Sequence, residues 1–357
     1  MKRLFLILFL LPLTSMAQEK AVTMWFSKEL NGRVKCFKEY SYDSKALADS
    51  TEKDEFYTLS IVQFNSDGEY TDWSNYDENG NLGWHLLNLF DGNGNVIESR
   101  SYSDGVLEGK DVFEYDDAGN EIKFFSWEYV GFLHDTTFYW IESSYDEKGR
   151  IILSNYYSDE DTASKYKSKT WQYDDKGNEI LSCMYDSEGN IRYKTIHSYD
   201  DSGRPHEVIS TYADTGLMSV DKYEYDSSGN YIITKGEYQE GKDLIMKIIE
   251  KYNSDGLYLK EIHHGSKDDL IGTISYTYNE IGKLLKEKTV DYDGTVYSND
   301  YYYEKDNLMR LQCFRSDELI REWLYEYDEK GNWIRELKND FLFSKRSLTI
   351  RQFEYYE

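Results

Sequence analysis

Hydrophobic and polar residues alternate along most of the chain in short runs, and each run ends at a turn signal. Alternation with a period of two is typical of β-strands that bury one face. Two positional columns recur relative to the turns. An aliphatic residue follows most turn glycines by three positions, at Ile97, Ile122, Ile152, Ile180, Ile232, Leu259, Leu285 and Ile334, with Thr71, His206 and Arg310 as exceptions. An aromatic residue recurs two positions before the turn motif, at Phe113, Trp171, Tyr223, Tyr276, Tyr301 and Tyr325. We expect these two columns to form the core.

The turn signals are copies of one motif: an aromatic residue, Asp or Asn, two variable residues and Gly. Copies begin at Phe64, Phe90, Tyr115, Tyr145, Tyr173, Tyr199, Tyr225, Tyr252, Tyr278 and Tyr327, with a degenerate copy at Tyr303. Their spacing near 26 residues is the signature of a repeat architecture. Asp or Asn favours a type I turn, and Gly readily takes the positive φ that closes a hairpin with a bulge. Each motif therefore predicts a β-hairpin turn.

A second, looser set of turns lies midway between the motifs, for example at Tyr76 to Gly80 and at Asp214 to Gly216. Two turns per repeat leave two strands of about eight or nine residues each. The sequence therefore predicts an all-β fold, an antiparallel β-hairpin repeat array of about 22 strands. Because twist prevents a sheet of more than ~10 strands from staying flat, we expect a curled or superhelical sheet. The irregular first and last copies are expected to cap it.

The N-terminal segment has the features of an export signal. Lys2 and Arg3 precede an apolar run from Leu4 to Leu13, and Ser15-Met16-Ala17 supplies small residues for cleavage before Gln18. We expect residues 1–17 to be a signal peptide and residues 18–357 to be a single repeat domain, with clear repeats at 55–335. The protein would then be periplasmic, at the cell surface or extracellular. No later run approaches ~18 apolar residues, so we expect no membrane-spanning helix.

Composition narrows the classes of partner. The chain has 35 Tyr, 24 Gly and only 2 Pro, and its formal net charge is −26. An aromatic content of 17% excludes a disordered acidic tail, and the negative charge argues against nucleic acid and anionic lipid as partners. Cys36, Cys183 and Cys313 are widely spaced and odd in number. We expect them to be small buried residues and not disulfides or zinc ligands.

The motif also resembles a known repeat. Tyr-Asp-x-x-Gly, seen at Tyr115 to Asn120 and Tyr145 to Arg150, resembles the YD or Rhs repeat of bacterial Rhs toxins, insecticidal toxin-complex shells and teneurins. The resemblance covers about residues 55–335 and implies hairpin arrays that form spirals or shells, often at cell surfaces, with carbohydrate binding proposed for some. Asn mostly replaces the Arg that usually follows Gly, and we find no terminal core motif or appended toxin domain. The chain is similar to short, exported YD-repeat proteins common in Bacteroides-like bacteria.

Metal and cofactor motifs are absent from the sequence pattern. Asp91 to Asn95 spaces oxygen ligands like the start of an EF-hand loop, but Val96 stands where that loop needs Gly and Tyr102 where it needs Glu. The six histidines show no metal-ligand spacing: His85, His134, His197, His206, His263 and His264. The adjacent pair His263 and His264 should point to opposite faces of a strand. We expect no metal and no cofactor.

Catalytic motifs are equally weak. Residues 236–243 match a phosphate-binding loop except that Asp243 replaces Ser or Thr, and we interpret the segment as a hairpin. A glycosidase needs two carboxyl groups at a defined separation in a cleft, and 67 acidic residues single out no pair. We therefore name no catalytic or binding residue. Six tryptophans outside the aromatic column are candidates for exposed stacking surfaces: Trp25, Trp73, Trp84, Trp127, Trp140 and Trp323.

These observations favour a non-catalytic, exported repeat protein that acts as a binding or scaffolding module at the cell envelope and recognises carbohydrate or protein. Two alternatives stay open. One is a carbohydrate-active enzyme, and the other is a toxin-delivery or immunity component related to Rhs systems.

Overall fold

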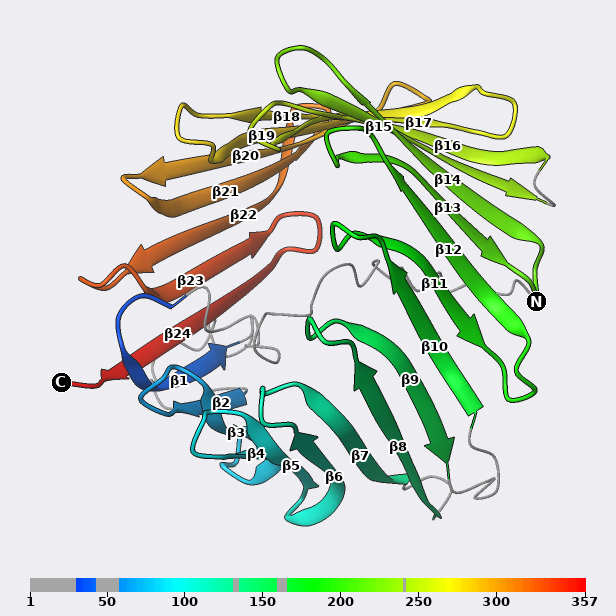
Figure 1. The fold of residues 1–357 in the computed structure, drawn as a ribbon. Coiled ribbons are helices and arrows are strands. Elements are labelled where there is room, and N and C mark those ends of the chain that lie inside the picture. Colours follow the sequence, from blue (N-terminus) through cyan, green and yellow to red (C-terminus); the bar gives the residue numbers. More distant parts are fainter. Residues whose placement is uncertain (1–29, 43–57, 131–134, 159–165, 240–241) are drawn as a thin grey trace.

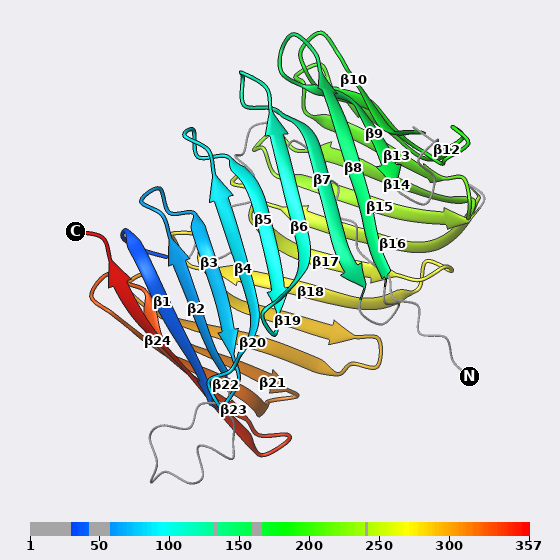
Figure 2. The same ribbon diagram turned by 90° about the horizontal axis from the view of Figure 1, so that it is seen from below.

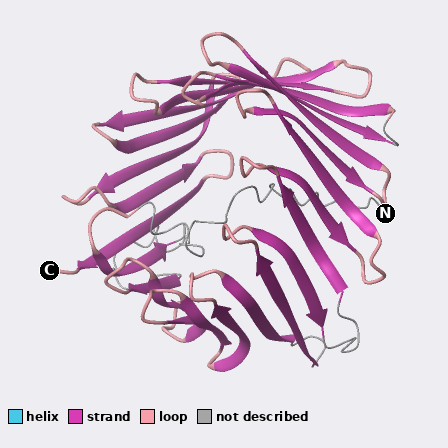
Figure 3. Cartoon of the chain, in the orientation of Figure 1, coloured by secondary structure: helices cyan, strands magenta, loops and turns pink. Residues whose placement is uncertain are grey.

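The computed structural model describes residues 30–42, 58–130, 135–158, 166–239 and 242–357. The expected signal peptide, Trp25, His134 and the insertion between Tyr42 and Phe56 lie outside the described residues. The described chain forms 24 β-strands and no helix, as Figure 3 shows. The all-β expectation is therefore confirmed.

The strands are β1 (Val34–Tyr42), β2 (Thr58–Phe64), β3 (Tyr70–Tyr76), β4 (Leu82–Phe90), β5 (Val96–Ser103), β6 (Val106–Tyr115), β7 (Glu121–Val130), β8 (Asp135–Tyr145), β9 (Ile151–Ser158), β10 (Tyr166–Tyr173), β11 (Glu179–Tyr185), β12 (Ile191–Tyr199), β13 (Pro205–Tyr212), β14 (Leu217–Tyr225), β15 (Tyr231–Gln239), β16 (Asp243–Tyr252), β17 (Tyr258–His264), β18 (Leu270–Tyr278), β19 (Leu284–Asp291), β20 (Val296–Glu304), β21 (Asn307–Arg315), β22 (Glu318–Tyr327), β23 (Trp333–Asp340) and β24 (Lys345–Tyr355).

The strands form one antiparallel sheet that closes on itself. Each strand pairs with the next along the chain, and β24 pairs with β1 from Val34↔Tyr355 to Tyr42↔Leu348. Figures 1 and 2 show the ring, with the red β24 beside the blue β1. The predicted hairpin array is confirmed, with 24 strands where the sequence predicted about 22. The curled or superhelical sheet is replaced by a closed one, and the terminal strands pair with each other instead of capping the array. Closure removes both sheet edges, whose backbone groups would otherwise lack partners.

Up-and-down pairing sorts the turns onto two rims of the barrel. The turns that follow even-numbered strands carry the repeated motif and lie at one end, which we call the motif rim. The turns that follow odd-numbered strands lie at the other end, which we call the opposite rim. The two ends of any hairpin therefore lie on different rims.

The motif turns have the predicted backbone geometry. The glycines of the ten complete motifs all have positive φ, between 74° and 97°. At a representative turn, Asp116 Oδ1 accepts the backbone N–H groups of Ala118 at 2.9 Å and Asn120 at 2.8 Å, and Oδ2 accepts the Asn120 side-chain amide at 2.9 Å. The bonds from Asn120 are the main cause that holds the pKa of Asp116 below its ordinary value. The Asn after Gly therefore stabilises the turn by bonding to the motif Asp. Where Arg150 replaces this Asn, its Nε donates to Asp146 Oδ2 at 2.7 Å.

The motif tyrosine ties each hairpin to the preceding one. The hydroxyl of Tyr115 donates to the carbonyl of Val96 at 2.9 Å, and that of Tyr145 donates to the carbonyl of Glu121 at 2.8 Å. Equivalent bonds are made by Tyr173, Tyr199, Tyr225, Tyr278 and Tyr327. Burial is the main cause that raises the pKa of Tyr115 to about 12. The repeated tyrosine is thus a connector between repeats as well as a part of the turn.

The expected core is only partly correct. In the aliphatic column, Ile97, Ile122, Ile152, Leu259 and Leu285 are 36–39% exposed, whereas the aromatic column is half-buried. The described strands form a single sheet, so no second described layer covers the aliphatic side chains. The fully packed apolar cluster instead lies where β1, β2 and β24 meet, and it comprises Val34, Phe37, Val62 and Phe64. Cys183 is buried as expected, Cys36 and Cys313 are half-buried, and all three thiols are free.

Candidate functional site

The seam between β1 and β24 holds the most compact packing among the described residues. Phe37 is 1% exposed, and its ring lies 6.1 Å from that of Phe64 and 5.7 Å from that of Phe353. Val34 and Val62 complete the cluster. Residues from both ends of the chain therefore build one core, which stabilises the closed barrel.

A buried cation crosses the seam. Arg351 on β24 is 8% exposed, and its Nε donates to Glu39 Oε2 on β1 at 2.8 Å. Its guanidinium carbon lies 3.6 Å from the centre of the Trp333 ring and 5.1 Å from that of Phe37. The ion pair and the two ring contacts join β23, β24 and β1.

A buried amide completes the closure at the motif rim. Asn332, which is 1% exposed, accepts the backbone N–H of Asn31 at 2.6 Å. Its own side-chain amide donates to the carbonyl of Asn31 and to the hydroxyl of Tyr355, both at 2.7 Å. In other repeats the side chain of the Asn at this position bonds to the Asp of its own turn, as Asn120 does to Asp116. In the last motif the Asn332 side chain bonds instead to Asn31, near the start of the described chain.

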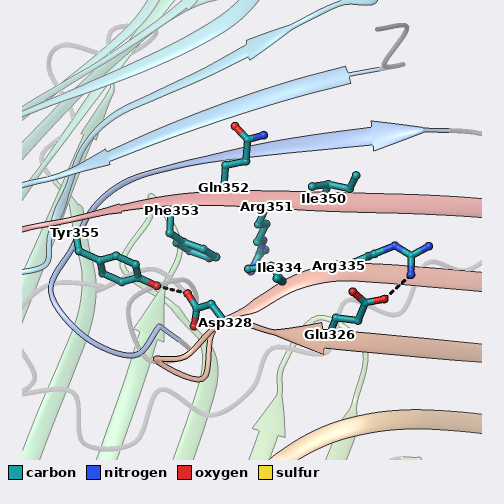
Figure 4. Close-up of a pocket in the computed structure, with 9 residues that line it drawn as sticks. All are labelled: Glu326, Asp328, Ile334, Arg335, Ile350, Arg351, Gln352, Phe353 and Tyr355. Atoms are coloured by element: carbon teal, nitrogen blue, oxygen red, sulfur yellow. Dashed lines mark hydrogen bonds and ion pairs between the residues drawn. The ribbon is translucent and has the colours of Figure 1, made fainter. Parts of the chain in front are cut away.

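A cavity opens beside this seam, between the motif-rim ends of β23 and β24. Their pairing runs from Asp340↔Lys345 to Arg335↔Ile350, and other ladders such as β7–β8 and β13–β14 likewise end before the motif turn, whereas β24 pairs with β1 as far as Tyr355. Figure 4 shows the two strands diverging and the side chains that lie around the gap. The resulting notch cavity measures about 510 Å³ and is lined by Glu326, Asp328, Ile334, Arg335, Ile350, Arg351, Gln352, Phe353 and Tyr355.

The notch cavity combines apolar walls with paired charges. Arg335 Nη1 donates to Glu326 Oε1 at 2.5 Å, and the Tyr355 hydroxyl donates to Asp328 Oδ2. Burial, followed by the bond to Asp328, raises the pKa of Tyr355 to about 12. The nine lining residues include no histidine, cysteine or serine. The arrangement suits recognition by apolar contact and hydrogen bonding.

No local pattern singles out a carboxylate pair, but the strand register brings one together. Glu250 on β16 faces Glu261 on β17 directly across the ladder. Glu250 contacts Lys235 Nζ at 2.7 Å and accepts the Tyr252 hydroxyl at 2.9 Å. Glu261 accepts the Tyr258 hydroxyl at 2.5 Å. Because both carboxylates already have close partners, the pair stabilises the wall.

A stack of tyrosine rings accompanies these carboxylates. Ring centres lie 4.6 Å apart for Tyr231 and Tyr252, 4.8 Å for Tyr252 and Tyr258, and 4.9 Å for Tyr258 and Tyr276. In such a stack each ring covers the face of its neighbour. Only the known strand register could have revealed this cluster, since no local spacing in the sequence marks it.

The other sequence candidates fall into structural roles. Asp91 caps its turn through three bonds from Asn93 and Asn95, which confirms the turn interpretation of this segment. Residues 236–239 end β15, as the hairpin interpretation predicts. The described tryptophans outside the aromatic column are half-buried: Trp73, Trp84, Trp127, Trp140 and Trp323.

Four of the described histidines contact acidic side chains. His85 contacts Asp72 at 2.9 Å, and His197 contacts Glu179 at 3.5 Å. His263 contacts Glu261 on one face of the sheet, while the adjacent His264 contacts Asp268. Within the described ranges, no three His, Cys, Asp or Glu side chains gather as metal ligands. The same ranges contain no helix that is long and apolar enough to cross a membrane.

Comparisons with known proteins find likeness in structure only. No protein family and no curated protein matches the sequence. Among solved structures, the Tc holotoxin pore of Photorhabdus luminescens matches at 13% identity and a TM-score of 0.20, over 85% of this chain and 26% of that one. A porin-like protein from Bacteroides uniformis matches at 8% identity and a TM-score of 0.26, over 91% and 99%. A second, from Bacteroides vulgatus, matches at 12% identity and a TM-score of 0.18, over 62% and 94%. The chain thus spans about a quarter of the toxin chain, and scores this low carry no argument about function.

Proposed function

We propose that this protein is a non-catalytic binding and scaffolding module of the cell envelope, and that it holds a segment of a partner protein in the notch cavity. The observation that carries the proposal is the cavity of about 510 Å³ where β23 leaves β24. Its volume falls within the range of pockets that hold ligands, and its walls are apolar with a few polar groups.

The aromatic rings of the cavity favour a protein segment over a sugar. A sugar stacks on a free ring face, but Lys330 Nζ lies 3.6 Å from the centre of the Tyr355 ring. The Phe353 ring packs against Phe37 at 5.7 Å and Tyr355 at 6.0 Å. The β23–β24 ladder ends at Arg335↔Ile350, which leaves the end of β24 beside the cavity. Backbone at the end of a ladder can accept an extended segment.

The non-catalytic part of the proposal is supported by the partners of the carboxylates in the motif turns, the tyrosine stack and the notch cavity. The motif aspartates cap turns, and Glu250, Glu261, Glu326 and Asp328 each have a close partner. The export part is supported by the predicted signal peptide and by the likeness of the motif to YD and Rhs repeats, a family to which we propose that the chain belongs. A carbohydrate ligand and polysaccharide turnover are the competing outcomes of the test.

The test compares the native protein with two tryptophan variants. Ile334→Trp places a bulky ring in the cavity, and Ile232→Trp makes the same change at the equivalent half-buried position of another repeat, on β15. Both are screened against solubilised envelope proteins, a glycan panel and polysaccharide substrates. We expect retention of a protein partner by the native chain and by Ile232→Trp, and loss in Ile334→Trp.

Two results would overturn the proposal. Equal binding by the two variants would remove the notch cavity from the function. Turnover of a polysaccharide, with no retained partner, would favour the enzyme alternative instead.

A further inference from the structure

The two central rings of the tyrosine stack, those of Tyr252 and Tyr258, are hydrogen-bonded to carboxylates. The hydroxyl of Tyr252 donates to Glu250 Oε2 at 2.9 Å, and the hydroxyl of Tyr258 donates to Glu261 Oε2 at 2.5 Å. The ladder between β16 and β17 places the two tyrosines opposite each other, and it does the same with the two glutamates. Two phenols and two carboxylates therefore form one compact cluster on the barrel wall.

Tyr252 departs from the pattern of the other motif tyrosines. Seven of them donate their hydroxyl to a backbone carbonyl of the preceding hairpin: Tyr115, Tyr145, Tyr173, Tyr199, Tyr225, Tyr278 and Tyr327. A carbonyl oxygen accepts this hydrogen bond but does not take the proton, because amides are very weak bases. A carboxylate accepts the bond and can also take the proton. The hydroxyl of Tyr252 thus faces a proton acceptor where those of the other seven do not.

Both central phenols keep their protons at neutral pH. Burial, followed by the bond to Glu250, raises the pKa of Tyr252. Burial, followed by the bond to Glu261, raises the pKa of Tyr258. Loss of an electron makes a neutral phenol strongly acidic, so its oxidation is favoured where a base takes the proton in the same step. Glu250 and Glu261 lie within hydrogen-bond reach of that proton, as such a base must.

The second oxygen of each carboxylate contacts a basic side chain. Glu250 Oε1 lies 2.7 Å from Lys235 Nζ, and Glu261 Oε1 lies 2.5 Å from His263 Nε2. The side chains of Lys235 and His263 are 39% and 27% exposed. Oε2 of each carboxylate is therefore directed to a phenol, and His263 extends the path of a proton from Glu261 towards solvent.

The stacking of the rings favours reaction within one molecule. The ring centres of Tyr252 and Tyr258 lie 4.8 Å apart, and their planes are inclined by 22°. The rings of Tyr231 and Tyr276 lie against the outer sides of this pair, at 4.6 and 4.9 Å. Rings in such contact can share an unpaired electron. Because the flanking rings cover the central pair, the nearest coupling partner of each central ring is the other.

We propose that Tyr252 and Tyr258 form a site of one-electron oxidation that ends in a dityrosine bond between them. Glu250 and Glu261 are its proton acceptors, and its co-reactant is a diffusible one-electron oxidant such as the carbonate radical. Each phenol gives its electron to the oxidant and its proton to the facing carboxylate, which leaves two neutral tyrosyl radicals. Their coupling forms a carbon–carbon bond between the ring carbons ortho to the hydroxyls.

Rearomatisation completes the reaction. Each ortho hydrogen moves through water to its phenol oxygen, and the two carboxyl groups release their protons to solvent. The pair has then lost two electrons and two protons. The site thereby consumes two oxidising equivalents and links the end of β16 to the start of β17.

The test exposes the purified protein at low concentration to brief flashes of light with ruthenium(II) tris-bipyridine and limiting persulfate, which generate a one-electron oxidant. A protease that cleaves before Asp separates residues 243–254 from residues 255–267. A bond between Tyr252 and Tyr258 then appears in mass spectrometry as a linked pair of these peptides. We expect this linked pair to be the first dityrosine product.

The decisive variant carries Glu250→Gln and Glu261→Gln. Glutamine preserves the size of each side chain and still accepts a hydrogen bond, but it does not take the proton. The yield of the linked pair should fall about a hundredfold. Circular dichroism confirms that the variant is folded.

Two controls separate the carboxylates from stacking and from charge. Tyr193 and Tyr212 also have ring centres 4.6 Å apart, but the Tyr193 hydroxyl donates to Ser210 Oγ at 3.0 Å. This pair should link far less, because a serine hydroxyl is a poor proton acceptor. Glu207→Gln removes a carboxylate that contacts Lys222 at 3.7 Å on the neighbouring strand, and it should leave the linkage unchanged.

Three results would overturn the inference. One is linkage of Tyr193 and Tyr212 equal to that of Tyr252 and Tyr258. Another is an unchanged yield in the double Gln variant. The third is oxidation that follows exposure alone, with bonds between molecules through Tyr292, which is 81% exposed.

This site is separate from the notch cavity, so the two proposals fail independently. Ile334→Trp, which fills the cavity, should form the dityrosine bond like the native chain. The double Gln variant should retain the envelope partner.

Discussion

The ion pair across the barrel seam offers a direct prediction, because its two residues meet only if the barrel closes. Arg351 and Glu39 lie 312 residues apart in sequence, yet their side chains bond at 2.8 Å. Replacing Arg351 by Ala removes this charge-assisted bond, worth about 1.5–3 kcal/mol. It also removes the contact with the Trp333 ring at 3.6 Å, worth roughly 0.5–2 kcal/mol. The free energy of unfolding should therefore fall by about 2–5 kcal/mol.

A double-mutant cycle isolates the part of this loss that belongs to the pair. Arg351→Ala, Glu39→Gln and the double variant are unfolded in urea and followed by tryptophan fluorescence. We expect a coupling energy of about 1–3 kcal/mol, since Arg351 is 8% exposed and Glu39 is only partly exposed. The same cycle on Arg321 and Asp340, which pair across the ordinary β22–β23 ladder at 2.9 Å, is the control.

One pattern of coupling energies would refute this reasoning. Coupling near zero for Arg351 and Glu39, together with normal coupling for Arg321 and Asp340, would mean that β1 and β24 are not paired in solution.

Three further predictions address the repeat. Gly229→Val should lower the free energy of unfolding by about 1–3 kcal/mol, because a β-branched residue is strained at φ +86°. Gly92→Val, at a turn position without positive φ, should lower it much less, and urea unfolding compares the two variants. Tyr115→Phe removes the bond to the preceding hairpin and should cost about 1 kcal/mol in the same assay, while Tyr292→Phe, at an 81% exposed ring, should be neutral. The pKa of Asp226 is lowered chiefly by its bond from Asn230, so its stabilising contribution is present above its unfolded pKa and is lost as pH falls through the lower folded value. Asp226→Asn should therefore flatten the fall in stability below about pH 4, and an unchanged pH profile would contradict the assigned turn bond.

Local features of the fold could be predicted from the sequence because each motif contains its own chemistry. Asp116, Gly119 and Asn120 form the turn from within six residues, so the hairpin follows from the motif alone. Closure could not be predicted in this way. It depends on curvature summed over all the strands and on contacts such as Asn31 with Asn332, which no local pattern records.

The candidate site was missed for a related reason. The notch cavity lies at the end of the β23–β24 ladder, beside Arg335↔Ile350, and the place where a ladder ends leaves no mark in the hydrophobic pattern. The sequence predicted that Ile122 is buried, but it is 36% exposed. Alternation of hydrophobic and polar residues distinguishes the two faces of a strand, but it does not show whether another layer packs on either face. The exposed turn at residues 341–343, in contrast, is visible in the sequence as three adjacent large apolar residues where a turn is due.

A designed disulfide across the seam tests the closed barrel most directly. Ser41 and Thr349 face each other on β1 and β24, so their β-carbons should lie about 4.5–5.5 Å apart, within reach of a disulfide. Ser41→Cys and Thr349→Cys are introduced with Cys36, Cys183 and Cys313 replaced by Ser, and intramolecular oxidation is measured by mass spectrometry and non-reducing electrophoresis. The closed barrel predicts nearly complete formation of a disulfide within each molecule. Two free thiols, or disulfides only between molecules, would contradict closure and restore the open, superhelical sheet.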